Sequence, residues 1–77
     1  SLRYLHVAVS EPSPGVPQFV EMGYLDGIPF MRYDSERGRA VPQVPWMEEE
    51  PEPGYWDRQT QNAKRSQQVV AIDLETL

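Results

Sequence analysis

Apolar residues in the last third of the chain recur at steps of three and four. From Tyr55 onwards there is no proline or glycine, and good helix formers such as glutamine, alanine, arginine and leucine are frequent. The pattern predicts one long helix over residues 54–77. One apolar stripe would pack on the preceding part of the chain: Trp56, Ala63, Val70, Leu74 and Leu77.

Two further lines of residues follow the same helical spacing. One mixes hydrogen-bonding groups with an aromatic and an aliphatic residue, which is too polar for a core and too regular for chance: Tyr55, Gln59, Asn62, Ser66, Val69, Asp73 and Thr76. The other is charged or polar throughout and is expected to face water: Arg58, Gln61, Arg65 and Gln68. Because Asp73 and Glu75 stand where a finished helix favours cations, the helix is expected to continue past Leu77.

The preceding residues alternate with the period of two that is typical of strands. Four strands are predicted, over residues 2–10, 18–25, 28–34 and 40–44. Asp26-Gly27 favours a hairpin between the second and third strands, because a primed turn needs positive φ at both positions. Pro29 removes a donor from the ladder and is most easily placed at the start of its strand.

The two outer strands of such a meander differ in how their edges are protected. Pro42 and Pro45 would protect the last strand against further pairing. The first strand has no proline or glycine and one charge, which leaves a long bare edge, and both of its faces carry sizeable side chains that we expect to be covered. We therefore expect half of the sheet to come from elsewhere.

Composition limits the possible functions. The chain has 77 residues, which allow one small domain, and no cysteine and one histidine, which exclude a disulfide framework and a Cys/His zinc site. A net charge of −5 opposes nucleic-acid binding, and the glutamates between residues 48 and 52 are expected to be solvated. No membrane span, leader or catalytic motif is present, so an enzyme or a cofactor is not expected and the chain is interpreted as a mature or excised fragment.

Several short motifs occur in the order found in a known family. They are Ser1-Leu2-Arg3-Tyr4, Pro17 with Phe19, Gly23-Tyr24-Leu25-Asp26, Tyr33-Asp34-Ser35, Pro45-Trp46, Tyr55-Trp56-Asp57 and Asp73-Leu74 with Leu77. Over its whole length the chain closely resembles the alpha-1 domain of a major histocompatibility complex class I heavy chain. The resemblance implies an α+β fold in which a four-stranded antiparallel sheet is crossed by one long helix.

The resemblance also implies a function in antigen presentation at the cell surface. Such a domain forms half of a groove for short peptides, and the alpha-2 domain of the same heavy chain supplies the other half by pairing with the first strand. Beta-2-microglobulin supports the sheet, and a T-cell receptor reads the displayed peptide. In the family the heavy chain assembles in the endoplasmic reticulum and is anchored by a membrane span outside this chain.

Family pocket residues carry over to matching positions. Tyr4 and Tyr55 would hold the peptide amino terminus, with Leu2, Phe30, Gln59 and Asn62 as the near wall. The pocket for the second peptide side chain would be lined by His6, Phe19, Glu21, Met31, Ala40 and Ala63, and its buried carboxylate predicts a polar or basic anchor. The groove would continue along Ser66 and Val69, and the carboxyl-terminal pocket would take Val70, Asp73, Thr76 and Leu77.

Further surfaces follow from the same resemblance. Beta-2-microglobulin would contact Leu5, Val7, Val9, Val20, Met22, Tyr24, Pro29, Arg32 and Gln43, whereas a receptor would face Arg58, Gln61, Arg65 and Gln68. Trp46 and Trp56 are expected to be packing residues. A short loop over residues 35–42 and a longer approach over residues 51–54 indicate a non-mammalian or divergent member.

Alternatives remain open at this point. Two copies of the chain joined through their first strands would rebuild an eight-stranded homodimeric platform. A divergent class I protein would bind an immune receptor without peptide. Tyr4 together with Tyr55 favours peptide over lipid. The metabolite-presenting branch of the family has a lysine near the position of Ala40, so capture of a metabolite as an imine is not expected here.

Overall fold

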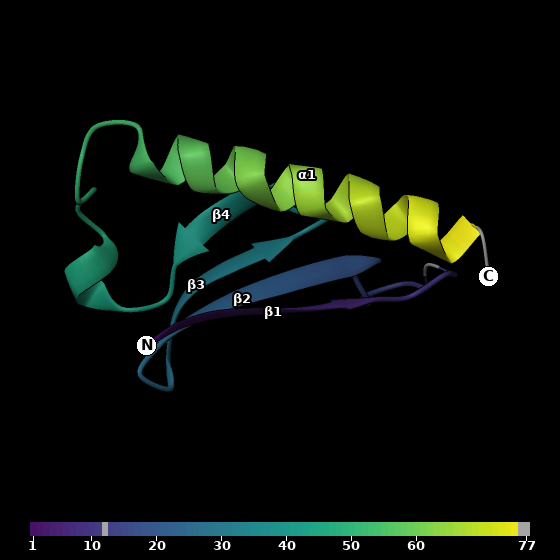
Figure 1. Cartoon of the computed structure of the whole chain (residues 1–77), viewed down its shortest axis with the longest axis horizontal. Helices are drawn as coiled ribbons and strands as arrows, with labels where there is room; N and C mark the ends of the chain where they lie inside the picture. Colours follow the sequence, from purple (N-terminus) through teal and green to yellow (C-terminus); the bar gives the residue numbers. More distant parts are fainter. Residues whose placement is uncertain (12, 76–77) are drawn as a thin grey trace.

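The chain folds into one antiparallel sheet crossed by a helix. The computed structural model describes residues 1–11 and 13–75. The strands follow each other in the order β1-β2-β3-β4, and the long helix α1 lies across one face of the sheet (Figure 1). This arrangement confirms the predicted α+β meander. The bounds are β1 Leu2–Ala8, β2 Phe19–Leu25, β3 Ile28–Asp34, β4 Arg39–Pro42, the 3₁₀ turn η1 Pro45–Met47 and α1 Tyr55–Glu75.

Element ends differ slightly from the predicted ones. β1 ends at Ala8, two residues early, although the Val9 N–H still donates to the Gln18 carbonyl at 3.0 Å. β4 ends at Pro42, which has no N–H with which to continue the ladder. The predicted helix continues over Thr76 and Leu77, which lie outside the described residues.

The β2–β3 hairpin explains how the sheet accommodates Pro29. Asp26 and Gly27 both have positive φ, 50° and 84°, as the predicted primed turn requires. Gly23 pairs with Met31 but Tyr24 pairs with Pro29, so Phe30 is the extra residue of a β-bulge. β4 pairs with β3 only from Met31 onwards, and Pro29 therefore lies outside the part of β3 that has two neighbouring strands.

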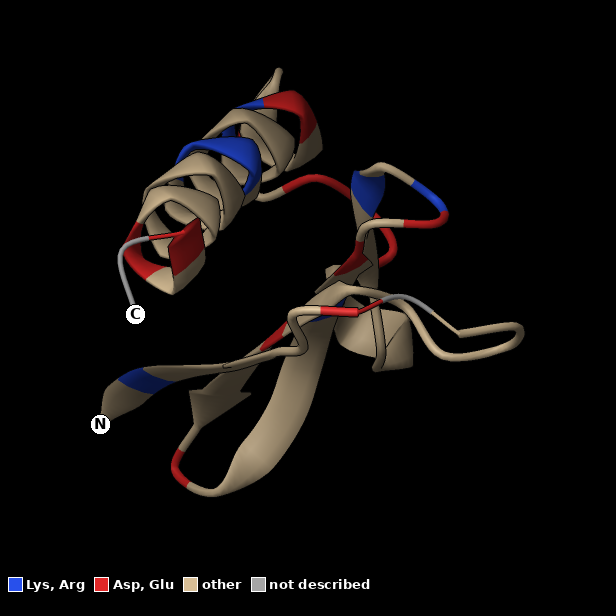
Figure 2. Cartoon of the chain, turned by 90° about the vertical axis from the view of Figure 1, so that its right-hand side faces the viewer, with Lys and Arg blue, Asp and Glu red and all other residues tan. Residues whose placement is uncertain are grey.

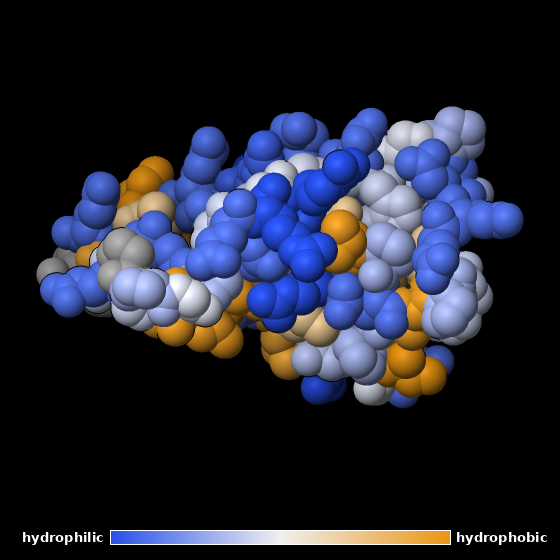
Figure 3. All heavy atoms as spheres, turned by 180° about the vertical axis from the view of Figure 1, so that it is seen from behind, coloured by the Kyte–Doolittle hydropathy of each residue, from blue (hydrophilic) through white to orange (hydrophobic). Residues whose placement is uncertain are grey.

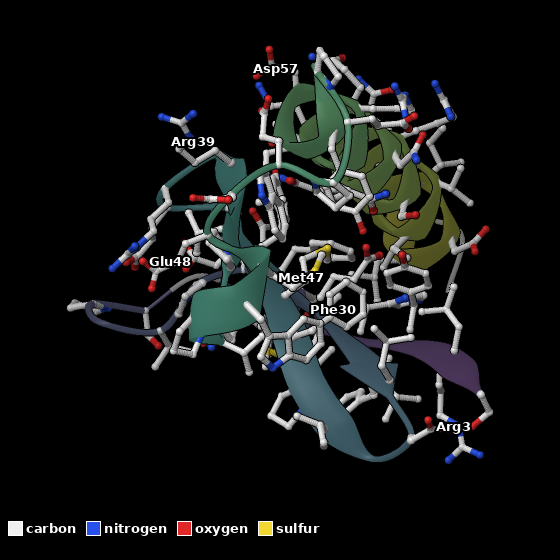
Figure 4. The ribbon with its side chains drawn as sticks, turned by 90° about the vertical axis from the view of Figure 1, so that its left-hand side faces the viewer. Arg3, Phe30, Arg39, Met47, Glu48 and Asp57 are labelled. Atoms are coloured by element: carbon white, nitrogen blue, oxygen red, sulfur yellow. The ribbon has the colours of Figure 1, made fainter. Side chains whose placement is uncertain are left out.

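The core lies between the sheet and the helix. Its buried hydrophobic residues are Phe19, Phe30, Met31, Tyr33, Ala40, Met47, Trp56 and Ala63. Phe30 and Met47 point into this layer, whereas Arg3, Arg39 and Asp57 point away from it (Figure 4). The Trp56 indole N–H donates to the Met47 carbonyl at 3.1 Å, as expected of a packing residue. The same prediction for Trp46 is wrong, because η1 turns Met47 inward and leaves Trp46 59% exposed.

One long side of α1 is hydrogen-bonded to β3 and β4. The Thr60 hydroxyl accepts from the Ala40 N–H at 2.9 Å and donates to the Trp56 carbonyl at 2.8 Å. Further along, the Tyr33 hydroxyl donates to Gln67 Oε1 at 2.7 Å. These contacts join the helix to β3 and β4, while its other side faces β1 and β2, where the Tyr4 hydroxyl donates to Gln59 Oε1 at 3.3 Å.

β1 is the exposed edge of the sheet. Residues 2–7 are all exposed, and among the described residues β1 pairs only with β2. The expectation that both faces of this strand are covered is therefore not met within the chain. β2, in contrast, alternates as predicted, with Phe19 and Glu21 buried toward the helix and Val20 and Met22 half-buried on the opposite face.

Charge is unevenly distributed over the molecule. Acidic residues mark the carboxyl-terminal end of α1, and basic residues lie further back along it (Figure 2). The last turn of the described helix contains Asp73 and no basic residue. The glutamates of residues 48–52 are exposed, as predicted, and Glu52 forms an ion pair with Arg58.

Candidate functional site

An open groove runs between the inner side of α1 and the floor formed by β1 and β2. Its first part has a volume of about 220 Å³ and is lined by Tyr4, His6, Glu21, Gln59, Asn62 and Ser66. The second part, of about 440 Å³, is lined by His6, Asn62, Arg65, Ser66, Val69, Val70 and Asp73. Because both parts share His6, Asn62 and Ser66, they form one continuous groove.

The β1–β2 register explains why these floor residues meet. Tyr4 and His6 are two residues apart on β1 and therefore point to the same face, toward the helix. His6 pairs with Glu21 on β2, which places the imidazole beside the carboxylate. The helix supplies Gln59, Asn62 and Ser66 at steps of three and four, so they share its inner side.

Tyr4 lies at the end of the groove nearest the start of the helix, and Tyr55 is the first residue of that helix. The Tyr4 hydroxyl donates to Gln59 Oε1 at 3.3 Å, and Tyr4 is 39% exposed, so a ligand can reach its ring. Tyr55 packs edge-on against Trp56, with ring centroids 5.0 Å apart. Burial raises the pKa of Tyr4 and of Tyr55 above the ordinary phenol value. Both phenols are therefore neutral near neutral pH and can donate and accept hydrogen bonds.

Glu21 is the buried acidic group of the groove. It is 6% exposed, and its carboxylate lies 4.0 Å from Nδ1 of His6. Burial raises the pKa of Glu21, while His6 and a hydrogen bond with Ser66 act in the opposite direction. His6 in turn stacks on Phe19 with ring centroids 5.6 Å apart. No lysine or arginine forms an ion pair with Glu21 in the described residues, so the carboxylate can receive a cation from a ligand.

The structure separates the predicted peptide-binding residues into groups. Those that line the groove are Tyr4, His6, Glu21, Gln59, Asn62, Ser66, Val69, Val70 and Asp73. Phe19, Phe30, Met31, Ala40 and Ala63 lie beneath it in the core, each at most 2% exposed. Leu2 is exposed at the start of β1, and Tyr55 is half-buried at the start of α1. Thr76 and Leu77 lie outside the described residues.

The opposite face of the sheet carries the residues predicted for beta-2-microglobulin. Leu5 and Val7 are 53% and 69% exposed, and Pro29 and Gln43 are also exposed. The half-buried ones are Val9, Val20, Met22, Tyr24 and Arg32. Seen from behind, the molecule is largely hydrophilic over the helix, and hydrophobic atoms gather along its lower edge (Figure 3).

Two contacts of the helix were not predicted from the sequence. Arg65 is exposed, as predicted, but it also lines the groove and donates to Asn62 Oδ1 at 3.2 Å. Its position three residues after Asn62 could have indicated this neighbourhood. Thr60 fixes the helix to β4, and no pattern in the sequence distinguishes it from a surface threonine.

Metal sites and membrane-spanning helices are absent from the described part of the chain. No group of three or more histidine, aspartate or glutamate side chains is placed to hold a metal ion there. Nor does the described helix have the length and apolar character needed to cross a membrane.

Comparison with known proteins identifies the family. A family model described as class I histocompatibility antigen, domains alpha 1 and 2, matches residues 1–77. The chain is 49% identical over 78 residues, 99% of its length, to the mouse H-2 class I histocompatibility antigen K-K alpha chain. It is 48% identical to the mouse D-K and K-B alpha chains over its whole length.

The match covers a small part of those relatives. The chain spans about a fifth of their length, 21–22%. Within that part, the strand order, the long helix and the matched residues agree with an alpha-1 domain. The chain therefore belongs to the class I histocompatibility antigen family, in which it is an alpha-1 domain.

Proposed function

We propose that this domain forms one half of a groove that binds short peptides and presents them to T-cell receptors. The observation that carries the proposal is the continuous groove from Tyr4 to Asp73, with a floor of two strands and one helical wall. Its second side is open beside the edge of β1 that has no partner strand among the described residues. An alpha-2 domain that pairs with β1 would extend the floor and supply the second wall.

The residues at the Tyr4 end suit a peptide amino terminus. A phenol oxygen accepts a hydrogen bond from an ammonium group while its ring buries apolar area. The Tyr4 hydroxyl donates its hydrogen to Gln59 Oε1 at 3.3 Å, so the Tyr4 oxygen can still accept a hydrogen bond in the groove. No catalytic role is proposed, because no sequence motif places a nucleophile beside Glu21 and His6.

The chemistry of Glu21 points to a class of peptide. A carboxylate that is 6% exposed and has no lysine or arginine partner among the described residues is costly to keep ionised. An arginine or lysine at the second position of the peptide would offset this cost by pairing with it. We therefore infer a preference for a basic second residue.

Peptide-dependent stability tests the proposed groove. The complete heavy chain is refolded with beta-2-microglobulin, with and without a pool of short peptides, and its melting temperature is measured. A ligand at about 100 times its dissociation constant adds about 2.7 kcal/mol, which shifts the melting temperature by several degrees. An unchanged melting temperature with every peptide pool would contradict the proposal and favour a divergent class I protein that binds a receptor without peptide.

The face of the sheet opposite the helix is proposed to contact beta-2-microglobulin. Leu5 and Val7 place exposed apolar area there, and Met22 lies beside Leu5 in the β1–β2 register. Leu5→Lys should weaken the association of the heavy chain with beta-2-microglobulin, measured by surface plasmon resonance, whereas Arg3→Lys should not. Equal affinities for the two variants would contradict this contact.

A second candidate function rests on the free edge of β1. The seven residues of β1 contain no proline or glycine and pair with β2 along one edge of the strand. Along the other edge, their backbone N–H and C=O groups have no partner strand among the described residues, which favours pairing with a second copy about a two-fold axis. Light scattering after size exclusion measures the mass of this chain alone. A dimer that is lost on Val7→Pro supports self-association, and a folded monomer contradicts it.

Cell-surface display is part of the same proposal. The named relatives are class I histocompatibility antigens, and we propose that the complete protein, after assembly in the endoplasmic reticulum, displays this domain on the extracellular side. The exposed Arg58, Gln61, Arg65 and Gln68 would then face the receptor. Staining of intact cells with an antibody to this helix tests the location, and a signal only after permeabilisation would contradict it.

A further inference from the structure

Gly23 lies at a point of the groove floor where a larger residue would not fit. It is buried in the middle of β2 and pairs with Tyr4 on one side and Met31 on the other. Its φ is not in the left-handed region, so its backbone conformation does not require glycine. Because glycine in a strand interior weakens the strand, the reason for it must lie in the space above its Cα atom.

That space is filled by two aromatic rings. A Cβ atom on Gly23 would lie 2.9 Å from Cε1 and 3.1 Å from Cζ of Phe30, and 3.0 Å from Cε1 of Tyr4. The two rings meet edge to face, with centroids 6.3 Å apart and an angle of 62°. Both rings therefore rest on the bare Cα atom of Gly23.

The two rings differ in how easily they can move. Phe30 is 1% exposed and is the extra residue of the β-bulge, so its ring is enclosed by the core. Tyr4 is 39% exposed and is held by its contact with Phe30 and by one hydrogen bond of 3.3 Å to Gln59. A methyl group at position 23 would therefore displace Tyr4 rather than Phe30, and a bond that is already long would be lost.

We propose that Gly23 is a positioning residue of the groove: its missing side chain lets Phe30 and Tyr4 pack so that the Tyr4 hydroxyl is fixed where a peptide amino group binds. The inference rests on the proposed peptide-binding function. Gly23 acts through Tyr4 and does not touch the peptide itself. A methyl group there shifts the phenol and weakens recognition of the amine, while the remainder of the groove is unchanged.

The test compares two peptides that differ only in their terminal amine. The complete heavy chain with beta-2-microglobulin is titrated with a peptide that has a free amino terminus and with the same peptide lacking that amino group. The measured quantity is the ratio of the two dissociation constants. A hydrogen bond to a charged amine predicts a ratio of about ten or more for the wild type.

Five variants relate this ratio to Gly23. Gly23→Ala and Tyr4→Phe should each lower it severalfold, and the double variant should lower it no further than the larger single effect. Phe30→Leu in the Gly23→Ala background should restore part of it by making room for the methyl group. Gly38→Ala, a strained change at φ 70° with nothing within 4 Å, should lower stability without changing the ratio.

The outcomes separate the two proposals. A wild type that binds neither peptide overturns the peptide groove and this inference together. A wild type that prefers the free amine while Gly23→Ala keeps the same ratio, or adds fully to Tyr4→Phe, overturns the role of Gly23 alone. If Gly23→Ala does not assemble, Phe30→Leu alone removes the support of Tyr4 from the other side, and an unchanged ratio in that variant also overturns the inference.

Discussion

Replacing Glu21 by glutamine tests the electrostatic basis of peptide choice. Glutamine has nearly the same size but no charge, at a position that is 6% exposed. We expect the variant to lose affinity for a peptide with arginine at its second position. Its affinity for the same peptide with citrulline should change little, because citrulline keeps the shape of arginine and carries no charge.

The magnitude follows from the surroundings of the carboxylate. Two charges 4 Å apart interact by about 4 kcal/mol at an effective dielectric constant of 20, which is an upper bound. The net value of a hydrogen bond to a charged group is about 1.5–3 kcal/mol. The His6 side chain, 4.0 Å from Glu21, is 46% exposed, so water reaches the site and favours the lower end. About 1.5 kcal/mol corresponds to roughly tenfold in affinity.

Competition binding of the two peptides to the assembled heavy chain measures this difference. The wild type should prefer arginine over citrulline by about tenfold, and Glu21→Gln should bind both about equally. Because burial raises the pKa of Glu21, its carboxylate becomes neutral at a higher pH than an exposed glutamate does. The wild-type preference should therefore decline as the pH falls through that raised pKa, and the variant should show no such decline.

The control is Glu48→Gln, which makes the same change in net charge at an exposed residue. It should keep the wild-type preference for arginine at every pH. If Glu21→Gln also keeps that preference, the carboxylate does not select the second residue.

Three further predictions concern stability of the assembled heavy chain. Thr60→Val should lower the free energy of unfolding by about 1–3 kcal/mol, because the buried Ala40 N–H loses its acceptor, whereas Thr60→Ser should be close to wild type in thermal denaturation. Met31→Ala, at a residue with 0% exposure, should cost about 2–5 kcal/mol in denaturant titration, and Met31→Leu less than about 1.5 kcal/mol. A hydrogen bond from the Arg37 N–H lowers the pKa of Asp34, so ionised Asp34 stabilises the fold at pH values above the ordinary aspartate pKa. The free energy of unfolding of wild type should therefore exceed that of Asp34→Asn by less as the pH falls below about 4. A difference that stays constant with pH would contradict this.

Local patterns predicted most of the fold. Asp26-Gly27 fixed the hairpin because few residue pairs tolerate positive φ at two successive positions, and the bounds of β3 were predicted correctly. The strand ends beside Ala8 and Pro42 were less accurate, because they depend on where the neighbouring strands stop. Trp46 was placed wrongly since the direction of a side chain in a 3₁₀ turn is not visible in a hydrophobic pattern.

The site could be predicted only in part. Period-two alternation on β1 and helical spacing on α1 brought Tyr4, His6 and Asn62 to one groove. The contact of Gly23 with two rings depends on the β-bulge at Phe30, which no local sequence pattern predicted. Long-range packing of this kind is set by the register between strands and is available only from the structure.

The ligands of the complete protein show whether this domain holds short peptides. The heavy chain is purified from cells with its natural partners, and the molecules released by acid are identified by mass spectrometry. We expect short peptides within a narrow range of lengths, enriched in arginine or lysine at the second position. Lipids, or a stable assembled protein that releases no ligand, would contradict it.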